Sequence, residues 1–530
     1  MPIDLPGFYY DPEKNRYFPI KGPIPGSHIQ KPPSKPDQAN EHHNNCRKKG
    51  IRTTELLQVR ELYGKVLNFD KWKCNFQQEY QKIRASQPMI WKYQKTDMIA
   101  DSALEQLHVD IQTLEGQNET NVLLMGSMNG SLSLYEVEKD GQHFDYGIKC
   151  MPDFVWPLTT ENQAECNNVP GHIWRPAGAS TLMSSNISCI QRTQKHYPRT
   201  PDDNLSIQHA LIATLGSETS GGSLYMLNLS EPLDLNPSDP ILRRRLVAVA
   251  SMNCTIWTAD CNSNGSEACR NCYFVYILIL YLVLSFIGTN LGAALVNLET
   301  GALSWLCRSK SDVFSQKFDH SGNIIICGFR NGAIVTVDVR QKQGFSARLP
   351  RHRVPYSSCT VREPSSSNAR KLTTQWFELK GNIRPFCTTS MPSSISSLVT
   401  LQTYDQYFLA SSMDGSIKLY DHRLMQRGAV QSYEGHVNSH TRIQLGVDPS
   451  EGLVMSGGED GYVRIWSIKT AELLFGTKIS SSAPSALCWP GTGMIAFSSE
   501  AKSQMGMSLF SDMANDRYGL EYLTCDKPSP

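Results

Sequence analysis

Two short segments of the chain place an arginine two residues after an aspartate. In one segment Asp338 precedes Arg340, and in the other Asp421 precedes Arg423. A carboxylate and a guanidinium can form two parallel hydrogen bonds, a planar geometry that the ammonium group of lysine does not offer. These four residues are therefore candidates for contact with a binding partner. The simpler alternative is that both arginines are ordinary surface residues of a repeat.

The sequence offers no comparable arrangement for catalysis. It contains no G-x-S-x-G nucleophile motif, no G-x-x-x-x-G-K-[ST] phosphate loop, no G-x-G-x-x-G and no H-E-x-x-H. Its carboxylates and histidines do not have the spacing of an acid–base pair. No catalytic residue is predicted, and the chain is expected not to be an enzyme.

Metal ligands are similarly sparse in the sequence. His436 and His440 have the spacing of zinc-finger histidines, but no cysteine pair stands just upstream of them. Cys269 and Cys272 form a Cys-x2-Cys pair, with Cys261 upstream, and one such pair without a second is weak evidence for zinc. Neither a metal nor another cofactor is predicted.

The strongest pattern in the chain is a repeated hairpin. Four copies have Asn or Asp before Gly, an apolar run before that turn, and a Tyr, Val or Trp six residues after the Asn or Asp; their turns are Asn129-Gly130, Asn331-Gly332, Asp414-Gly415 and Asp460-Gly461. Asn-Gly and Asp-Gly suit a type I′ turn, which needs positive φ at both central residues. Looser copies occur at LIATLGSETSGGSLYMLNL, GTNLGAALVNLETG and SALCWPGTGMIAFSS. About seven units predict an all-β, seven-bladed β-propeller, and a β-sandwich of similar hairpins is the alternative.

One repeat resembles a known family closely. The segment GHVNSH, followed by MSGGEDGYVRIW, is similar to a WD40 repeat. The resemblance implies a hydrogen-bonded structural tetrad of His436, Ser456, Asp460 and Trp466. A buried histidine and a buried aspartate need such partners, so this role concerns the fold and not chemistry.

The two Asp-x-Arg segments resemble the Trp-Asp-x-Arg box of WD40 substrate receptors for cullin-4 RING ubiquitin ligases, although Val337 and Tyr420 replace the Trp. The stretches LPGFYYDPEKNRYF, SSMDGSIKLYDHR and YEGHVNSH resemble the same family. The resemblance implies that Arg340 and Arg423 reach the adaptor, damage-specific DNA-binding protein 1. It implies that Asp338 and Asp421 orient the arginines.

On that resemblance the chain is a non-catalytic receptor that brings substrate proteins, still unidentified, to the adaptor and the cullin-4 complex. The alternative is a WD40 scaffold in a nuclear or ribonucleoprotein complex, with the basic stretch 341–393 as its contact. Net charge is +1 with 19% charged residues, so the whole chain has no electrostatic signature of a nucleic-acid or membrane binder. The start of the chain lacks a secretory signal pattern, and a nuclear or cytoplasmic location is expected.

Four regions are predicted from composition and periodicity. Residues 1–52 hold an aromatic hairpin over 8–18 and a disordered linker, and 53–100 form one or two helices, the first over 54–67. The propeller spans 101–515, with a long Ser/Pro-rich loop at 341–393, and a tail covers 516–530.

An apolar insert is predicted within the propeller at about 261–287. Its run CYFVYILILYLVLSFI, residues 272–287, is shorter than the about 20 residues that a membrane span needs. We therefore expect an insertion between blades, from a translated intron or an alternative exon, after which the fold resumes at GTNLGAALVNLETG. A transmembrane helix is the alternative.

Overall fold

The computed structural model divides into two compact units, Met1–Leu56 and Leu57–Pro530. It describes residues 8–11, 16–19, 66–69, 72–75, 82, 85, 90–93, 102–113, 116–137, 147–150, 152–156, 173–176, 178–195, 207–217, 220–234, 241–261, 284–298, 300–339, 350–359, 372–381, 383–484, 486–488 and 494–497. In the first unit β1 (Phe8–Asp11) pairs antiparallel with β2 (Arg16–Pro19), which confirms the hairpin predicted there.

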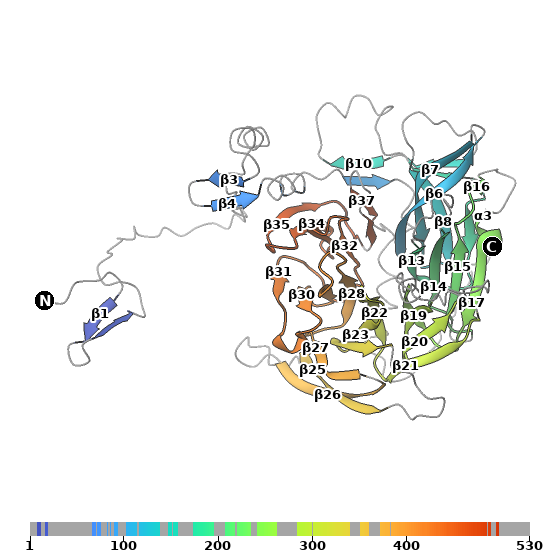
Figure 1. Cartoon of the computed structure of the whole chain (residues 1–530). Helices are drawn as coiled ribbons and strands as arrows, with labels where there is room; N and C mark the ends of the chain where they lie inside the picture. Colours follow the sequence, from blue (N-terminus) through green and yellow to red (C-terminus); the bar gives the residue numbers. More distant parts are fainter. Residues whose placement is uncertain are drawn as a thin grey trace, which may run out of the picture. The chain divides into compact units, whose positions relative to one another are not determined.

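The second unit is an all-β propeller (Figure 1). Six blades are built around consecutive antiparallel strands. Blade one contains β6 (Ala103–Thr113), β7 (Gly116–Gly126), β8 (Ser131–Val137), β9 (Gly147–Cys150), β11 (Ile173–Pro176), β12 (Ser180–Leu182) and β16 (Leu233–Asp234). Blade two contains β13 (Ile187–Lys195), β14 (Ile207–Thr214), β15 (Ser223–Asn228) and β17 (Leu246–Ser251), with α3 (Ile241–Arg245) before β17. Blade three contains β18 (Ile256–Cys261), β19 (Leu284–Thr289), β20 (Gly292–Asn297), β21 (Leu303–Ser309), β26 (Leu372–Gly381) and β25 (Arg351–Cys359).

The later blades follow the same plan with four strands each. Blade four contains β22 (Val313–Phe318), β23 (Ile324–Phe329), β24 (Ala333–Asp338) and β27 (Ile383–Ser390). Blade five contains β28 (Ile395–Thr400), β29 (Tyr407–Ser412), β30 (Ile417–Asp421) and β31 (Gln431–Tyr433), with the 3-10 helix η3 (Met425–Arg427) between the last two. Blade six contains β32 (Leu445–Val447), β33 (Leu453–Gly457), β34 (Tyr462–Ser467) and β35 (Leu473–Lys478).

A closing sheet joins distant parts of the chain. It combines β36 (Ala486–Cys488) and β37 (Met494–Phe497) with β5 (Ile90–Tyr93) and β10 (Pro152–Trp156). The first strands of the sheets contact one another in the order β6, β13, β18, β22, β28, β32 and β36, and β36 in turn contacts β6. The predicted count of seven therefore needs correction to six blades of consecutive strands. The repeat pattern detects hairpins only. The last of them, β36–β37, is completed by β5 and β10, which come from much earlier in the chain.

The hairpin turns differ from the predicted type. Gly130, Gly332, Gly415 and Gly461 all have positive φ, from 77° to 85°, but the Asn or Asp before each of them does not. Each glycine N–H instead donates to a carbonyl three residues earlier. The Asn or Asp side chain accepts the N–H of the residue after glycine, at 2.8–3.2 Å. These are type I turns with glycine at the fourth position, stabilised by an Asx hydrogen bond, so the type I′ prediction is wrong.

The core lies between neighbouring sheets. Leu107, Val122 and Leu134 of blade one are fully buried with Ala210 and Ile212 of blade two in one cluster. The same kind of apolar packing joins blades three and four and blades five and six. Burial on both faces explains why the strands are nearly continuous apolar runs and do not simply alternate.

Two regions that were predicted to be helical or irregular contain strands. Where helices were expected, β3 (Val66–Phe69) and β4 (Trp72–Asn75) form an antiparallel hairpin. Further along, Lys82 and Ala85 are helical. Residues 53–65 lie outside the described part. The loop expected over 341–393 contains β25, β26 and β27. In these strands apolar and polar residues alternate only weakly. The Ser, Pro and basic residues of the region therefore dominated the prediction and suggested a loop.

The apolar insert is shorter than predicted. Leu284–Ile287 belong to β19, which pairs with β18 on one side and β20 on the other, so the fold resumes before Gly288. Residues 262–283 lie outside the described part. Among the described residues, no helix is long and apolar enough to cross a membrane.

Candidate functional site

The pair Asp421 and Arg423 forms a compact ion pair at the end of β30. The guanidinium donates from Nε to Oδ1 and from Nη2 to Oδ2 of Asp421, both at 3.2 Å, and the Arg423 backbone N–H donates to Oδ1 at 2.9 Å. The aspartate side chain is 8% exposed and the arginine side chain 62% exposed. The buried carboxylate thus holds an outward-facing arginine in one orientation.

The electrostatics agree with this geometry. Burial acts to raise the pKa of Asp421, but hydrogen bonds from the side chain and backbone of Arg423, together with its charge, lower the pKa below the ordinary value for aspartate. The carboxylate therefore stays ionised at neutral pH and can keep accepting both guanidinium hydrogen bonds.

Asp338 occupies the same position in the neighbouring blade. It is the last residue of β24 and pairs with Ile324, the first residue of β23, as Asp421 pairs with Tyr407, the first residue of β29. The Asp338 side chain is buried. Arg340 lies outside the described residues, so the predicted second pair is placed only through its aspartate.

Three exposed apolar side chains lie in chain segments next to the Asp421–Arg423 pair. Tyr404, Leu424 and Val430 are 50%, 45% and 57% exposed. Tyr404 lies in the turn before β29. This turn is bonded to the segment that carries Arg423, since the N–H of His422 donates to Gln406 O at 3.0 Å. Exposed apolar side chains grouped around a fixed charge are typical of a protein-binding surface.

A residue from blade six fixes this turn. Glu451 accepts hydrogen bonds from the backbone N–H groups of Gln402 and Thr403, the latter at 2.7 Å. Glu451 itself has φ 54°, a conformation that is uncommon for a residue other than glycine. Sequence reasoning missed Glu451 and Tyr404, because no motif links these residues to the Asp-x-Arg pair.

The predicted WD40 residues are brought together in part. His436 is buried, its Nε2 lies 2.8 Å from Gly457 O and 3.2 Å from the Ser456 hydroxyl, and its ring meets that of Trp466 edge-on. The Trp466 indole N–H donates to Glu434 O at 2.8 Å. Asp460 accepts from the guanidinium of Arg464 at 3.0 and 2.5 Å. Burial lowers the pKa of His436, which favours the neutral ring.

His440 takes part in a different cluster. Glu459 accepts hydrogen bonds from the Ser439 and Thr441 hydroxyls at 2.6 Å each, and from the N–H groups of His440 and Thr441. Burial acts to raise the pKa of Glu459, but these hydrogen bonds lower it to about 2. Within the described part of the chain, no group of three potential ligands could hold a metal ion; Cys269 and Cys272 fall outside that part.

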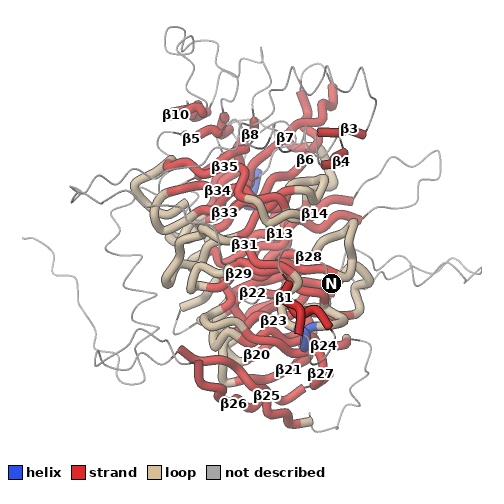
Figure 2. The backbone as a smooth tube through the Cα atoms, turned by 90° about the vertical axis from the view of Figure 1, so that its left-hand side faces the viewer, coloured by secondary structure: helices blue, strands red, loops and turns tan. Residues whose placement is uncertain are grey.

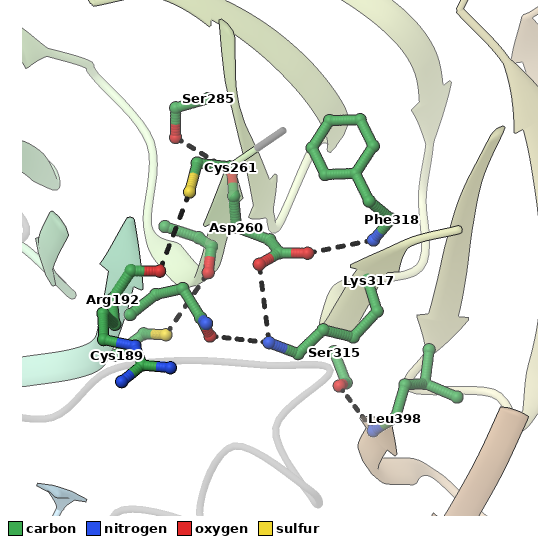
Figure 3. Close-up of polar contacts among 11 residues, drawn as sticks. Cys189, Arg192, Asp260, Cys261, Ser285, Ser315, Lys317, Phe318 and Leu398 are labelled. Carbon is green, nitrogen blue, oxygen red and sulfur yellow. Dashed lines mark hydrogen bonds and ion pairs between the residues drawn. The ribbon is translucent and has the colours of Figure 1, made fainter. Parts of the chain in front are cut away.

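Polar side chains connect the first strands of successive blades (Figure 3). Asp260 of blade three accepts the N–H of Phe318 in blade four at 2.9 Å, and Lys317 donates to Asp260 at 3.4 Å and to Gln191 of blade two at 2.6 Å. Ser315 of blade four likewise accepts the N–H of Leu398 in blade five at 2.9 Å. These contacts fix the register between blades, and no sequence motif predicts them.

Two further charged groups lie near this network. Burial raises the pKa of Glu105 in β6 to about 7, although the charges of Lys317 and Arg192 act to lower it. Arg442, just before β32, donates to Ser188 O of blade two at 3.3 Å and to Phe314 O of blade four at 3.0 Å. One side chain of blade six thus connects two other blades.

A family model and individual relatives both show that this chain is similar to DDB1- and CUL4-associated factor 4. Residues 371–522 match the family model of the DDB1- and CUL4-associated factor 4 beta-propeller domain, and this range contains both Asp421 and Arg423. The chain is 24% identical over 541 residues to human DDB1- and CUL4-associated factor 4, covering 98% of this chain and 87% of that protein. Human DDB1- and CUL4-associated factor 4-like protein 2 is 40% identical over 97 residues, 18% of this chain and 23% of that protein. WD repeat-containing protein 21 of Schizosaccharomyces pombe is 26% identical over 185 residues, 34% of each chain. The resemblance inferred from the motifs is confirmed.

Proposed function

Because this chain resembles DDB1- and CUL4-associated factor 4 over most of its length, we propose that it is a non-catalytic substrate receptor of a cullin-4 RING ubiquitin ligase. In this role it binds the adaptor, damage-specific DNA-binding protein 1, and presents substrate proteins to the ligase. The observation that carries the proposal is the exposed Arg423, which the buried Asp421 holds in a fixed orientation.

The pair suits adaptor binding for a physical reason. An arginine that is already ordered loses less side-chain entropy when it binds, and the Arg423 side chain is 62% exposed. Arginine is also common among the few residues that dominate protein interfaces. The exposed Tyr404, Leu424 and Val430 in adjoining segments would add apolar area to such a contact.

We propose that the neighbouring blade supplies a second contact. Asp338 is buried at the position in blade four that Asp421 holds in blade five, so Arg340 is suited to the same task as Arg423.

The chemistry of the ligase lies elsewhere in the complex. Positioning two reactants can lower a barrier substantially, and this is the contribution that the proposal assigns to the chain. Ubiquitin transfer itself is carried out by the RING partner and its conjugating enzyme.

Co-purification with the adaptor tests the proposal. The wild-type chain, an Arg340→Ala/Arg423→Ala variant and an Arg330→Ala variant are compared. Arg330 is a matched control because it also pairs with an aspartate, Asp312 at 3.6 Å, but at the opposite end of the blade-four strands. We expect the adaptor to co-purify with wild type and with Arg330→Ala. We expect little or no adaptor to co-purify with the double variant. Absence of the adaptor from the wild-type sample would favour a scaffold in another assembly.

A further inference from the structure

The β25–β26 hairpin extends a blade to which it does not belong in sequence. It follows β24 of blade four, but β26 pairs with β21, the last of the consecutive strands of blade three. Figures 1 and 2 both place β25 and β26 beside β21 and β27. The result is a six-stranded sheet with β25 at its edge.

One face of this hairpin packs on the propeller. Val354 and Leu379 are buried in the cluster that joins blades three and four. Phe377 lies against Phe329 of blade four, with ring centroids 5.5 Å apart. Since side chains alternate along a strand, the residues between these must lie on the opposite face.

That opposite face carries a row of positive charges. Arg308 of β21 is directly opposite Lys380 of β26, which is directly opposite Arg351 of β25. Neighbouring strands are about 4.8 Å apart, so three cations fall within about 10 Å. Arg353 adds a fourth cation two residues along, opposite Glu378. Like charges directly opposite one another destabilise a sheet.

Within β21, β25 and β26, one acidic residue offsets this charge. Glu378 is the single acidic residue in β21, β25 and β26, and its ion pair with Arg351, at 3.5 Å, joins side chains that are 48% and 73% exposed. An ion pair so exposed contributes little to stability. A second feature lies on the same face: Trp376, opposite Pro355, is 62% exposed. A large exposed indole next to unbalanced positive charge indicates a binding surface.

We propose that this basic face, defined by Arg308, Arg351, Arg353, Lys380 and Trp376, binds an acidic peptide segment of a partner protein. Guanidinium groups match carboxylates through paired hydrogen bonds, and Trp376 provides an apolar anchor between the charged contacts. The whole chain has a net charge of +1 and a pI of about 7.5, which favours a peptide over a nucleic acid.

Recognition takes place on the face of the sheet, not along its edge. Pro355 lies within the edge strand β25 and has no N–H to donate to an added strand. The segment is therefore read by side chains. The proposal goes beyond the receptor function, since the basic face belongs to the sheet of blade three and the Asp421–Arg423 pair to blade five.

Fluorescence anisotropy of the full chain with a labelled peptide tests this. The probe is a short peptide of alternating Asp and Glu with one central Phe, and a single-stranded oligonucleotide of similar length is the comparison. The proposal expects salt-sensitive binding of the peptide. It expects that Arg351→Glu/Arg353→Glu weakens binding by at least about tenfold and that Trp376→Ala weakens it severalfold. Lys469→Glu, a charge reversal at another exposed position, is the control and should change nothing.

Two readouts separate loss of binding from loss of folding. Thermal melting of the double variant should be close to that of wild type, because Arg351→Glu replaces repulsion with Lys380 by attraction whereas Arg353→Glu introduces repulsion with Glu378. Adaptor co-purification should also be unchanged, so failure here is distinct from failure of the receptor function. The proposal is overturned if the peptide does not bind, if the folded double variant binds it as well as wild type, or if the oligonucleotide binds more tightly.

Discussion

Asp421 and Arg423 share a two-point ion pair in which the carboxylate is buried and the guanidinium is exposed. The two N–O distances are equal at 3.2 Å, and the side chains are 8% and 62% exposed. The spacing of two residues across the end of β30 creates this asymmetry, since the strand buries its last side chain and the turn after it points outward. A charge ordered in this way is suited to binding and needs no rearrangement to engage a partner.

Replacing Glu105 by Gln should stabilise the protein at high pH. The pKa of Glu105 is raised to about 7 in the folded state, chiefly by burial, so folding favours the protonated carboxyl. The folded state then binds more protons than the unfolded state between the ordinary glutamate pKa of 4.5 and about 7, and wild-type stability falls as pH rises through that window. Glu105→Gln should be more stable than wild type by on the order of 3 kcal/mol above pH 7. Below the unfolded pKa the difference should vanish. Urea unfolding of both proteins across this range measures it, and a difference independent of pH would contradict the assignment.

Glu459 should show the opposite pH dependence. Burial acts to raise its pKa, but the hydrogen bonds from Ser439, Thr441 and His440 lower it to about 2, from the ordinary glutamate value of 4.5. Its stabilising contribution is thus fully present above the unfolded pKa and is lost as pH falls toward 2. We expect Glu459→Gln to melt at a lower temperature than wild type at neutral pH, with the gap closing under acid conditions. Thermal melts monitored by circular dichroism provide the measurement. A gap that widened in acid would exclude the proposed cause.

Gly461→Ala should cost more than Gly428→Ala, although both glycines have positive φ, 77° and 84°. A Cβ on Gly461 would lie 2.0 Å from the carbonyl oxygen of Ser480, whereas a Cβ on Gly428 would meet nothing within 4 Å. Gly428→Ala therefore reports backbone strain alone, about 1–3 kcal/mol for φ 84° and ψ −163°. Gly461→Ala adds a steric clash in the turn between β33 and β34. The free energies of unfolding of the two variants test this, and equal losses would show that the turn relaxes to accept the methyl group.

The hairpins were predictable because their determinants are local. The Asp414-Gly415 turn, the apolar run before it and the aromatic Tyr420 after it all fall within a few residues, and β29 and β30 pair as the sequence indicates. The same holds for the ion pair, since Asp421 and Arg423 are separated by one residue. Even here the turn type was wrong, because the Asx side chain and not a second positive φ stabilises the turn.

Long-range pairing was not predictable in this way. No local sequence feature near Gly381 indicates that β26 pairs with β21 at Cys307. Likewise, no local feature indicates that β37 pairs with β5, about 400 residues earlier in the chain. Glu451 likewise reaches the turn at Gln402 from another blade. Such contacts depend on how whole sheets pack, which a repeat pattern does not encode. For the same reason the sequence indicated a loop at 341–393, where an added hairpin finds its partner strand in the preceding blade.

The central claim is that an oriented arginine on blade five binds the adaptor. Its most direct test is the dissociation constant of the purified adaptor for four versions of the full chain: wild type, Arg423→Ala, Arg423→Lys and Arg330→Ala. We predict that Arg423→Ala weakens binding by at least about tenfold, that Arg423→Lys restores little of the loss because lysine cannot form the two-point pair with Asp421, and that Arg330→Ala binds as wild type does. Equal affinities for wild type and Arg423→Ala, with both proteins folded, would contradict the claim.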